Sequence, residues 1–329
     1  MNPPRVQTED YINFLIATPK ACSATEAARV QPDKPRAAAH DAFTRLLHRL
    51  EPDPETLWLE AKPAVVLDEG ALILDDSVLD KPYAKQIDLV GHHWSGKHHA
   101  VVKGIDLVSL VWTDGDRPIP CDYRIYHDAK QATKNDHFRA MIKTAKERGF
   151  KPSYVLFDSW YASLENLKLL REYKWPWLTR LKANRLVNLD RQGSRPLFRT
   201  EIAATGTIVW LPGYGRVKVF KIVAKDGDIG YWATSDLGMD ELTRQQYGEY
   251  SWAIESYHRG IKQCTQVERC QARKAVAQKN HIGLALRAFL RLEAFAFSRG
   301  ISWVEAKTSI IRDAVRSYLA HPWIRLATA

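Results

Sequence analysis

Two apolar segments of this chain each lead into acidic residues, and this pattern restricts the fold more than any other feature of the sequence. Leu72-Ile-Leu precedes Asp75 and Asp76, and Tyr154-Val-Leu-Phe precedes Asp158. Short runs rich in β-branched and aromatic residues are typical of buried strands. An ionised side chain directly after such a run is costly unless a metal ion or another cation pairs with it. We therefore expect a sheet whose strand ends gather carboxylates.

A third acidic residue, Glu255, lies in a helical pattern that runs from Trp252 to Lys262. Strands and a helix can direct three carboxylates to one place. Carboxylate oxygens suit Mg²⁺ or Mn²⁺, and two such ions about 4 Å apart can activate a nucleophile and stabilise the leaving oxygen of a phosphodiester. The pattern therefore indicates a nuclease or a strand transferase.

Charge and composition support a polyanionic partner. The 329-residue chain carries a formal charge of +10, and basic residues gain affinity by releasing the counterions condensed on nucleic acid. No run of about 18 apolar residues predicts a membrane span. Met1-Asn-Pro-Pro-Arg leads into polar sequence rather than a signal peptide, so we expect an intracellular protein. The 4 cysteines form no CxxC pair, which argues against a disulfide framework or a zinc ribbon.

The pattern of elements divides the chain into four regions. Residues 1–62 are helical, with segments at Thr8–Ala17, Ser23–Val30 and Ala37–Leu50. The last two segments resemble a DNA-binding helix-turn-helix, and the alternative is a small bundle that caps the main domain.

Residues 63–183 combine strands with helices. Strands are expected at 64–67, 71–74, 100–112, 119–126, 154–157 and 177–181, and helices at 137–148 and 163–173. This order predicts an α/β fold with an RNase H-like mixed sheet, in which ligands bind beyond the carboxyl ends of the strands. Residues 184–240 form a β-rich insertion with strands at 207–211, 216–224 and 230–234, and residues 241–329 return to helices that complete the catalytic domain.

The three acidic motifs resemble the DDE motif of transposases of the IS4 superfamily, most closely the IS701 family. The motifs are Leu74-Asp-Asp-Ser, Leu156-Phe-Asp-Ser and Ile254-Glu-Ser-Tyr-His-Arg-Gly-Ile-Lys, and the resemblance extends over roughly residues 70–290. The family's third motif reads Tyr, two residues, Arg, three residues, Glu, six residues, Lys. Glu255 and Lys262 keep this spacing, whereas Gly248 and Ser251 occupy the Tyr and Arg positions. Neighbouring residues that could replace those two phosphate contacts are Tyr247, Tyr250 and Arg259.

The resemblance implies an RNase H-like catalytic domain interrupted by a β-rich insertion. It also implies a transposase that binds terminal inverted repeats as a homodimer, cuts both strands of double-stranded DNA and joins the 3′-hydroxyl ends to target DNA. Catalysis would use two Mg²⁺ or Mn²⁺ ions per active site, in the bacterial cytoplasm at the nucleoid. Two alternatives stay open: an RNase H-like nuclease that cuts without joining, and a domesticated DNA-binding protein without catalysis.

Asp75 and Asp76 compete for the role of first metal ligand. Neighbouring side chains of a strand point to opposite faces, so only one of the two can face Asp158. In relatives the ligand precedes a small residue, and Ser77 follows Asp76. We therefore expect Asp76, Asp158 and Glu255 to be the catalytic metal ligands, with Asp75 facing away. The alternative for Glu255 is an ordinary helical salt bridge to Arg259.

Several further residues are candidates for DNA contact. Lys262, Arg259 and Tyr257 belong to the third motif, and the basic run after it could follow phosphates or be a solvated helix face. The run comprises Arg269, Arg273, Lys274 and Lys279. Lys97, in the histidine-rich segment His92–His99, is expected in a DNA-contacting hairpin loop rather than at a zinc site.

Aromatic residues of the insertion are candidates for base stacking. Trp210, Tyr214 and Trp232 could stack on an unpaired base, as an aromatic residue of the insertion does in relatives. The alternative is that they belong to the core of the sheet.

Overall fold

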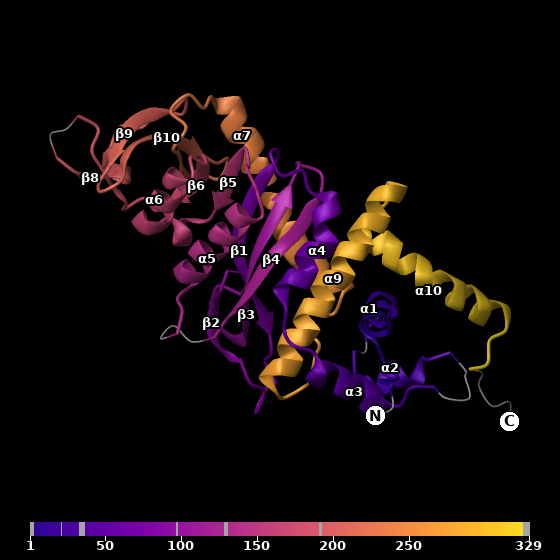
Figure 1. Cartoon of the computed structure of the whole chain (residues 1–329). Coiled ribbons are helices and arrows are strands. Elements are labelled where there is room, and N and C mark those ends of the chain that lie inside the picture. Colours follow the sequence, from indigo (N-terminus) through magenta and orange to yellow (C-terminus); the bar gives the residue numbers. More distant parts are fainter. Residues whose placement is uncertain are drawn as a thin grey trace. The chain divides into compact units, whose positions relative to one another are not determined.

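The computed structural model describes residues 3–20, 22–32, 37–96, 98–127, 131–190 and 193–324 (Figure 1). The chain forms two compact units, each discontinuous in sequence. The helical unit comprises residues 1–60, 79–105 and 258–329, and the sheet unit comprises residues 61–78 and 106–257. None of the helices in the described ranges is both long enough and apolar enough to span a membrane.

The helical unit is built around one long helix. Its helices are α1 (Thr8–Ala17), α2 (Ala24–Arg29), α3 (His40–Arg49), α9 (Ala275–Arg299) and α10 (Trp303–Ala320), with most of α4 (Pro54–Ala61). Figure 1 shows α1 and α3 beside α9, and both pack against it. The predicted helical character of the N-terminal region is therefore confirmed.

Buried hydrogen bonds fix α9 to its neighbours. The Tyr11 hydroxyl lies 2.9 Å from Nδ1 of His281, whose Nε2 lies 3.0 Å from the carbonyl oxygen of Gln266. The imidazole therefore donates through Nε2 and accepts through Nδ1. Burial lowers the pKa of His281 to about 3, so the ring is neutral in the folded protein.

Two buried lysines hold the connection between α8 (Trp252–Cys264) and α9. The Lys81 ammonium donates to the carbonyl oxygens of Glu268 and Cys270, each at 2.7 Å. The Lys307 ammonium donates to carbonyl oxygens of α1 and to that of Cys264, the last at 2.6 Å. Backbone oxygens thus satisfy the donors of both buried cations, whose pKa values burial lowers.

The sheet unit contains a mixed sheet, which confirms the predicted fold class. Its strands are β1 (Ala71–Asp80), β3 (Ala100–Thr113), β4 (Pro118–Tyr126), β5 (Tyr154–Phe157), β6 (Trp177–Leu181), β9 (Thr207–Leu211), β10 (Gly215–Val223) and β11 (Ile229–Thr234). The hydrogen-bonded order is β4-β3-β1-β5-β6-β11-β10-β9. Pairs β1–β5 and β5–β6 are parallel, and pairs β3–β4, β6–β11, β11–β10 and β10–β9 are antiparallel. Residues at the end of β1 and the start of β3 belong to the helical unit.

The β-rich segment extends the main sheet. Strand β11 pairs with β6, so β9, β10 and β11 continue the sheet beyond the parallel strands. Only β7 (Leu186–Val187) and β8 (Arg195–Pro196) form a separate two-stranded sheet among the described residues.

Helices α5 (Lys134–Glu147), α6 (Leu164–Glu172) and α7 (Glu241–Tyr250) complete the sheet unit, together with the first half of α8. Phe138 of α5 packs edge-on against Phe157 at the end of β5, with ring centroids 5.3 Å apart. The same ring stacks on Tyr161, which lies in the short 3-10 turn Ser159–Tyr161 after β5. These aromatic contacts fix the chain on both sides of Asp158.

Two details of the strand prediction are wrong. Residues 64–67 form no strand: Lys62–Ala64 is a 3-10 turn with a proline in its first positions, and the Ala64 carbonyl accepts from the Arg117 guanidinium rather than from a neighbouring strand. The histidine-rich segment, expected as a loop, begins as strand β2 (Gly91–Ser95), which pairs with the start of β3. In β2 His93 and Ser95 are buried while Trp94 is exposed, an alternation typical of a strand.

Candidate active site

Asp158 follows the last residue of β5. Its Oδ1 accepts a 2.8 Å hydrogen bond from the backbone N–H of Trp160, so the carboxylate caps the turn after the strand. Asp158 is an exposed residue, yet the surrounding protein desolvates its carboxyl group and, with the neighbouring charge of Asp76, raises its pKa.

The register of β1 and β5 bears on the choice between Asp75 and Asp76. Leu74 and Phe157 are the last pair of the parallel register, and Asp75 and Asp158 are the next residues on the two segments. Paired residues of parallel strands point to the same face of a sheet. The expectation that Asp75 faces away from Asp158 stays a prediction, and the register, continued by one residue, does not favour it. Strand alternation alone cannot decide between Asp75 and Asp76. It shows that the two side chains point to opposite faces of the sheet, but not which of them points to the same face as Asp158.

Asp76 is held by a network that the sequence analysis missed. Lys134, the first residue of α5, places its ammonium 2.6 Å from Asp76 Oδ2 and 2.6 Å from Asp106 Oδ2. The Tyr161 hydroxyl donates to Asp76 Oδ1 at 2.6 Å. Asp106 is buried in the apolar strand β3, and a charged residue inside such a run is the one sequence signal that could have identified it.

The carboxyl groups at these strand ends perturb one another. Burial raises the pKa of Asp75 well above its usual value, and the charges of Asp76, Asp158 and Glu255 raise it further. Burial and the charge of Asp76 likewise raise the pKa of Asp106 to about 7. Burial alone would lower the pKa of Lys134, but the two carboxylates beside it raise the value. The cluster is thus an acidic site with one internal cation.

Glu255 lies in the first turn of α8 and is exposed. In addition to burial, the charge of Glu255 raises the pKa of Asp75, so Glu255 is near enough to the end of β1 to influence the carboxyl group there. No ion pair joins it to a basic side chain in the part of the chain that the structure describes, so the helical salt bridge to Arg259 is not formed.

The donor set suits a hard divalent cation, although it is not arranged as a finished metal centre. Asp75, Asp158 and Glu255 offer only carboxylate oxygens, the ligands that Mg²⁺ and Mn²⁺ prefer. Across the described ranges, however, no three His, Cys, Asp or Glu side chains converge closely enough to hold one ion. The negative charges of Asp75, Asp158 and Glu255 repel one another, and a divalent cation bound between these carboxylates would offset that repulsion.

The predicted DNA contacts differ in their surroundings. Tyr257 is fully buried, next to Ser109, so its side chain belongs to the core and is not available to DNA. Lys262 is half-buried and forms a 3.2 Å ion pair with Glu268 within the helical unit. Lys97 lies outside the described residues.

The basic run lies mainly in a loop. Arg269, Arg273 and Lys274 are exposed in the connection between α8 and α9, and Lys279 is half-buried in the first turns of α9. Arg259, in the second half of α8, is exposed as well. These side chains are therefore mostly accessible, as phosphate contacts require.

The aromatic residues of the insertion fall into different classes. Tyr214 is buried, and its hydroxyl accepts a 3.0 Å hydrogen bond from the Trp177 indole, so it belongs to the core. The Arg180 guanidinium lies 5.0 Å from the centre of the Trp232 ring. Trp210, on the terminal strand β9, remains partly exposed.

Comparisons with known proteins bear on the family and the fold of the chain. The family described as DDE superfamily endonuclease matches residues 5–197 of the chain. Among solved structures, the fold is similar to that of the piggyBac transposase in a synaptic complex with hairpin DNA, with a TM-score of 0.52 and 13% sequence identity. The alignment covers 97% of this chain and 72% of the piggyBac chain. No curated protein sequence matches the chain.

Proposed function

The chain belongs to the DDE superfamily endonucleases, and from that premise we propose that it is a DNA transposase of the IS4 superfamily, closest to the IS701 family. It would bind the terminal inverted repeats of its element as a homodimer, cut both strands and join the 3′-hydroxyl ends to target DNA. The observation that carries the proposal is that β1 and β5 are adjacent parallel strands whose last paired residues are followed by Asp75 and Asp158, within the electrostatic influence of Glu255 in the first turn of α8.

We assign the metal-binding role to Asp75, Asp158 and Glu255. Support for Asp75 over Asp76 comes from its register with Asp158 and from the influence of Glu255 on its pKa. Asp76 is instead occupied by Lys134 and Tyr161, so it would position the end of β1. Bound Mg²⁺ or Mn²⁺, in two copies, would activate the attacking oxygen and stabilise the leaving one.

DNA is the partner that the charge of the chain favours. The formal charge of +10 and the exposed loop residues Arg269, Arg273 and Lys274 suit a phosphate backbone. From the resemblance to bacterial transposases we infer that the protein would act at the nucleoid. An endonuclease that cuts without joining has the same site, and only its products would differ.

One experiment tests the proposal directly. The protein is incubated with Mg²⁺, a plasmid carrying the DNA that flanks its gene on both sides, and a second plasmid as target. Excised element and joined products are expected, whereas cut ends without joining would identify a nuclease. Absence of cutting with both Mg²⁺ and Mn²⁺ would reject both activities.

A further inference from the structure

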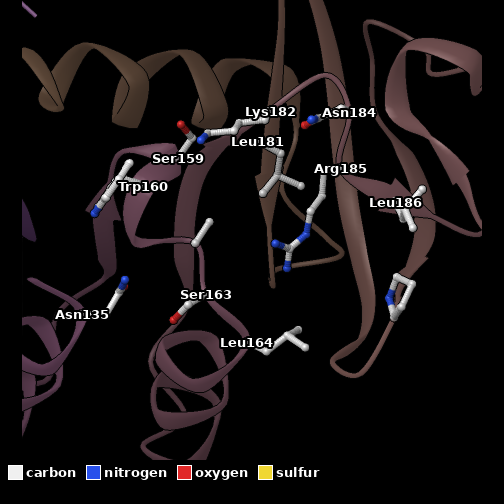
Figure 2. Close-up of a pocket in the computed structure, with 12 residues that line it drawn as sticks. Asn135, Ser159, Trp160, Ser163, Leu164, Leu181, Lys182, Asn184, Arg185 and Leu186 are labelled. Atoms are coloured by element: carbon white, nitrogen blue, oxygen red, sulfur yellow. The ribbon is translucent and has the colours of Figure 1, made fainter. Parts of the chain in front are cut away.

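Two pockets of the sheet unit lie at opposite ends of strand β6. The first, of about 660 Å³, is lined by Leu181 at the carboxyl end of β6 and by Ser159, which follows Asp158 (Figure 2). It therefore adjoins the strand ends that carry the proposed metal ligands. The second, of about 510 Å³, is lined by Trp175 and Pro176, which directly precede β6. It lies at the amino ends of the parallel strands, and we call it the amino-end pocket.

The amino-end pocket is lined by three cations and one carboxylate. Arg171 and Lys174 belong to the end of α6 and the turn after it, and Arg216 belongs to β10. All three are exposed, and none of them forms an ion pair with an acidic residue that the structure describes. The carboxylate is that of Asp236, whose oxygens accept from the Tyr154 hydroxyl at 2.5 Å and from a backbone N–H at 2.9 Å. The pocket thus has positive charge that protein groups do not neutralise.

Tyr214 holds the first of these cations in place. The Arg171 guanidinium donates to the Tyr214 carbonyl oxygen and lies 4.9 Å from the centre of the Tyr214 ring. The ring itself is fixed, because its hydroxyl accepts from the Trp177 indole in the core. A guanidinium group has five N–H donors, so this arrangement fixes its plane and leaves donors for an anion. Gly215 has a φ of +130°, and a Cβ added there would lie 3.9 Å from the guanidinium, so glycine keeps the space before it open.

Lys174 occupies a position that favours glycine. Its φ of +57° is left-handed, the conformation in which many helices end at a glycine. The end of α6 does not need the ammonium group, because the backbone N–H groups of Tyr173, Lys174 and Trp175 already bond three of its last carbonyl oxygens. The helix therefore does not explain a lysine at this position, whereas the pocket beside it gives the charge a use.

We propose that the amino-end pocket binds a phosphate group through Arg171, Lys174 and Arg216. Guanidinium groups match the geometry of phosphate oxygens, and an ammonium group adds a compact charge beside them. Ser235 offers a neutral donor to the same space. Its hydroxyl oxygen accepts from the backbone N–H of Trp177, which leaves its own hydrogen available to the phosphate.

The DNA backbone is the source of phosphate that the formal charge of +10 favours. Between Pro176 and Leu181 the chain advances about 16 Å, at about 3.3 Å per residue, so a phosphate held here is not the one that is cut. The inference therefore goes beyond the proposed function and adds a contact with DNA away from the active site. A free compound with the same group, such as pyrophosphate, is the other source, and the experiment separates the two.

Binding is measured with a short fluorescein-labelled DNA duplex in Ca²⁺, so that no cleavage interferes, over a series of salt concentrations. Arg216→Gln and Lys174→Asn should each lower the slope of log K against log salt by about one and weaken binding about fivefold at about 0.1 M salt. Lys225→Gln removes an exposed lysine that does not line the pocket. This variant is the matched control, and its slope should equal that of the wild type.

The unfolding midpoint of Lys174→Asn separates binding from folding. Asparagine tolerates the left-handed conformation better than lysine does, so the midpoint should stay the same or rise while binding weakens. A lower midpoint together with weaker binding would instead assign Lys174 to the stability of the fold and overturn its role as a phosphate contact.

Pyrophosphate provides the second arm, without a divalent metal. Unchanged duplex slopes in both variants, with an unfolding midpoint that pyrophosphate raises in the wild type but not in the double variant of Lys174→Asn and Arg216→Gln, would keep the phosphate site and make a free compound its source. Unchanged slopes without an effect of pyrophosphate would overturn the proposal, as would a loss of slope in Lys225→Gln equal to that in the pocket variants. Neither arm needs cleavage, so failure of this site and failure of transposition are read separately.

Discussion

Lys134 bonds Asp76 through its ammonium group, 2.6 Å from Oδ2, and this contact distinguishes the surroundings of Asp76 from those of the adjacent Asp75. The same ammonium also reaches Asp106, and the Tyr161 hydroxyl bonds Asp76 Oδ1, so protein groups occupy both oxygens of Asp76. Among the described residues no basic side chain forms an ion pair with Asp75, whose pKa is raised by burial and by the charges of Asp76, Asp158 and Glu255. A metal ligand must keep its oxygens available, and a positioning residue need not.

The first prediction concerns these neighbours. Asp75→Asn should abolish cleavage, because it removes a proposed metal ligand, whereas Asp76→Asn should lower the rate about 10- to 100-fold, as loss of a group that supports metal ligands typically does. Rates are measured in single turnover on DNA carrying the element ends. The reverse order of the two variants would return the ligand role to Asp76, as the sequence pattern alone suggests.

Loss of the internal cation should reduce stability. Lys134→Met leaves Asp76 and Asp106 facing each other without a counter-charge, and breaking a buried ion pair from one side costs about 3 kcal/mol or more. Urea unfolding measures this cost. The double variant Lys134→Met with Asp106→Asn removes one of the two charges as well and should recover part of the loss. Equal stability of wild type and Lys134→Met would show that the ammonium contributes little.

Metal dependence gives the third prediction. Asp158→Asn and Glu255→Gln should each abolish cleavage while DNA affinity stays within about twofold, because each change removes a proposed metal ligand and no proposed phosphate contact. Mg²⁺ or Mn²⁺ should support cutting, Ca²⁺ should support binding alone, and EDTA should stop the reaction. Normal cutting by either variant, or full activity in EDTA, would contradict the metal assignment.

Local features of the fold could be read from the sequence, and pairings between distant segments could not. Strands β5 and β6 occur at the predicted residues 154–157 and 177–181, because short apolar runs bounded by turn residues are self-contained signals. The bond from Lys134 to Asp76 joins residues 58 positions apart, and no local pattern announces it. The choice between Asp75 and Asp76 likewise depends on the register with β5.

Tyr257 is a second case in which the sequence motif alone does not show where the side chain lies. Its place in the third motif predicts a contact with DNA, but its side of α8 packs into the core. Motif spacing shows that residues share a helix, and only the packing of that helix shows which of its side chains reach solvent.

Acid should destabilise the helical unit through His281. Its pKa is about 3 in the folded protein and near 6.5 when unfolded, so between these values the unfolded chain binds a proton that the folded protein does not. The stabilisation is complete above pH 6.5 and is lost as pH falls, by about 1.4 kcal/mol for each pH unit. The free energy of unfolding, measured from pH 7 to pH 4, should therefore fall less steeply in His281→Gln than in the wild type. The same pH dependence in both proteins would show that His281 is not the cause of the acid destabilisation.

The last prediction separates two kinds of basic residue. Affinity for DNA should fall steeply with salt, with each neutralised phosphate adding about −0.9 to the slope of log K against log salt. Lys274→Ala and Lys279→Ala should weaken binding and reduce this slope by about one each.

Lys262 follows Glu255 on α8 at the spacing of the family motif, and its ion pair with Glu268 holds its side chain in place. Lys262→Ala should therefore slow cleavage of bound DNA more than it weakens binding, because the side chain would position the phosphate to be cut. Equal losses of affinity in all three variants, with unchanged cleavage of bound DNA, would leave Lys262 as one more surface charge.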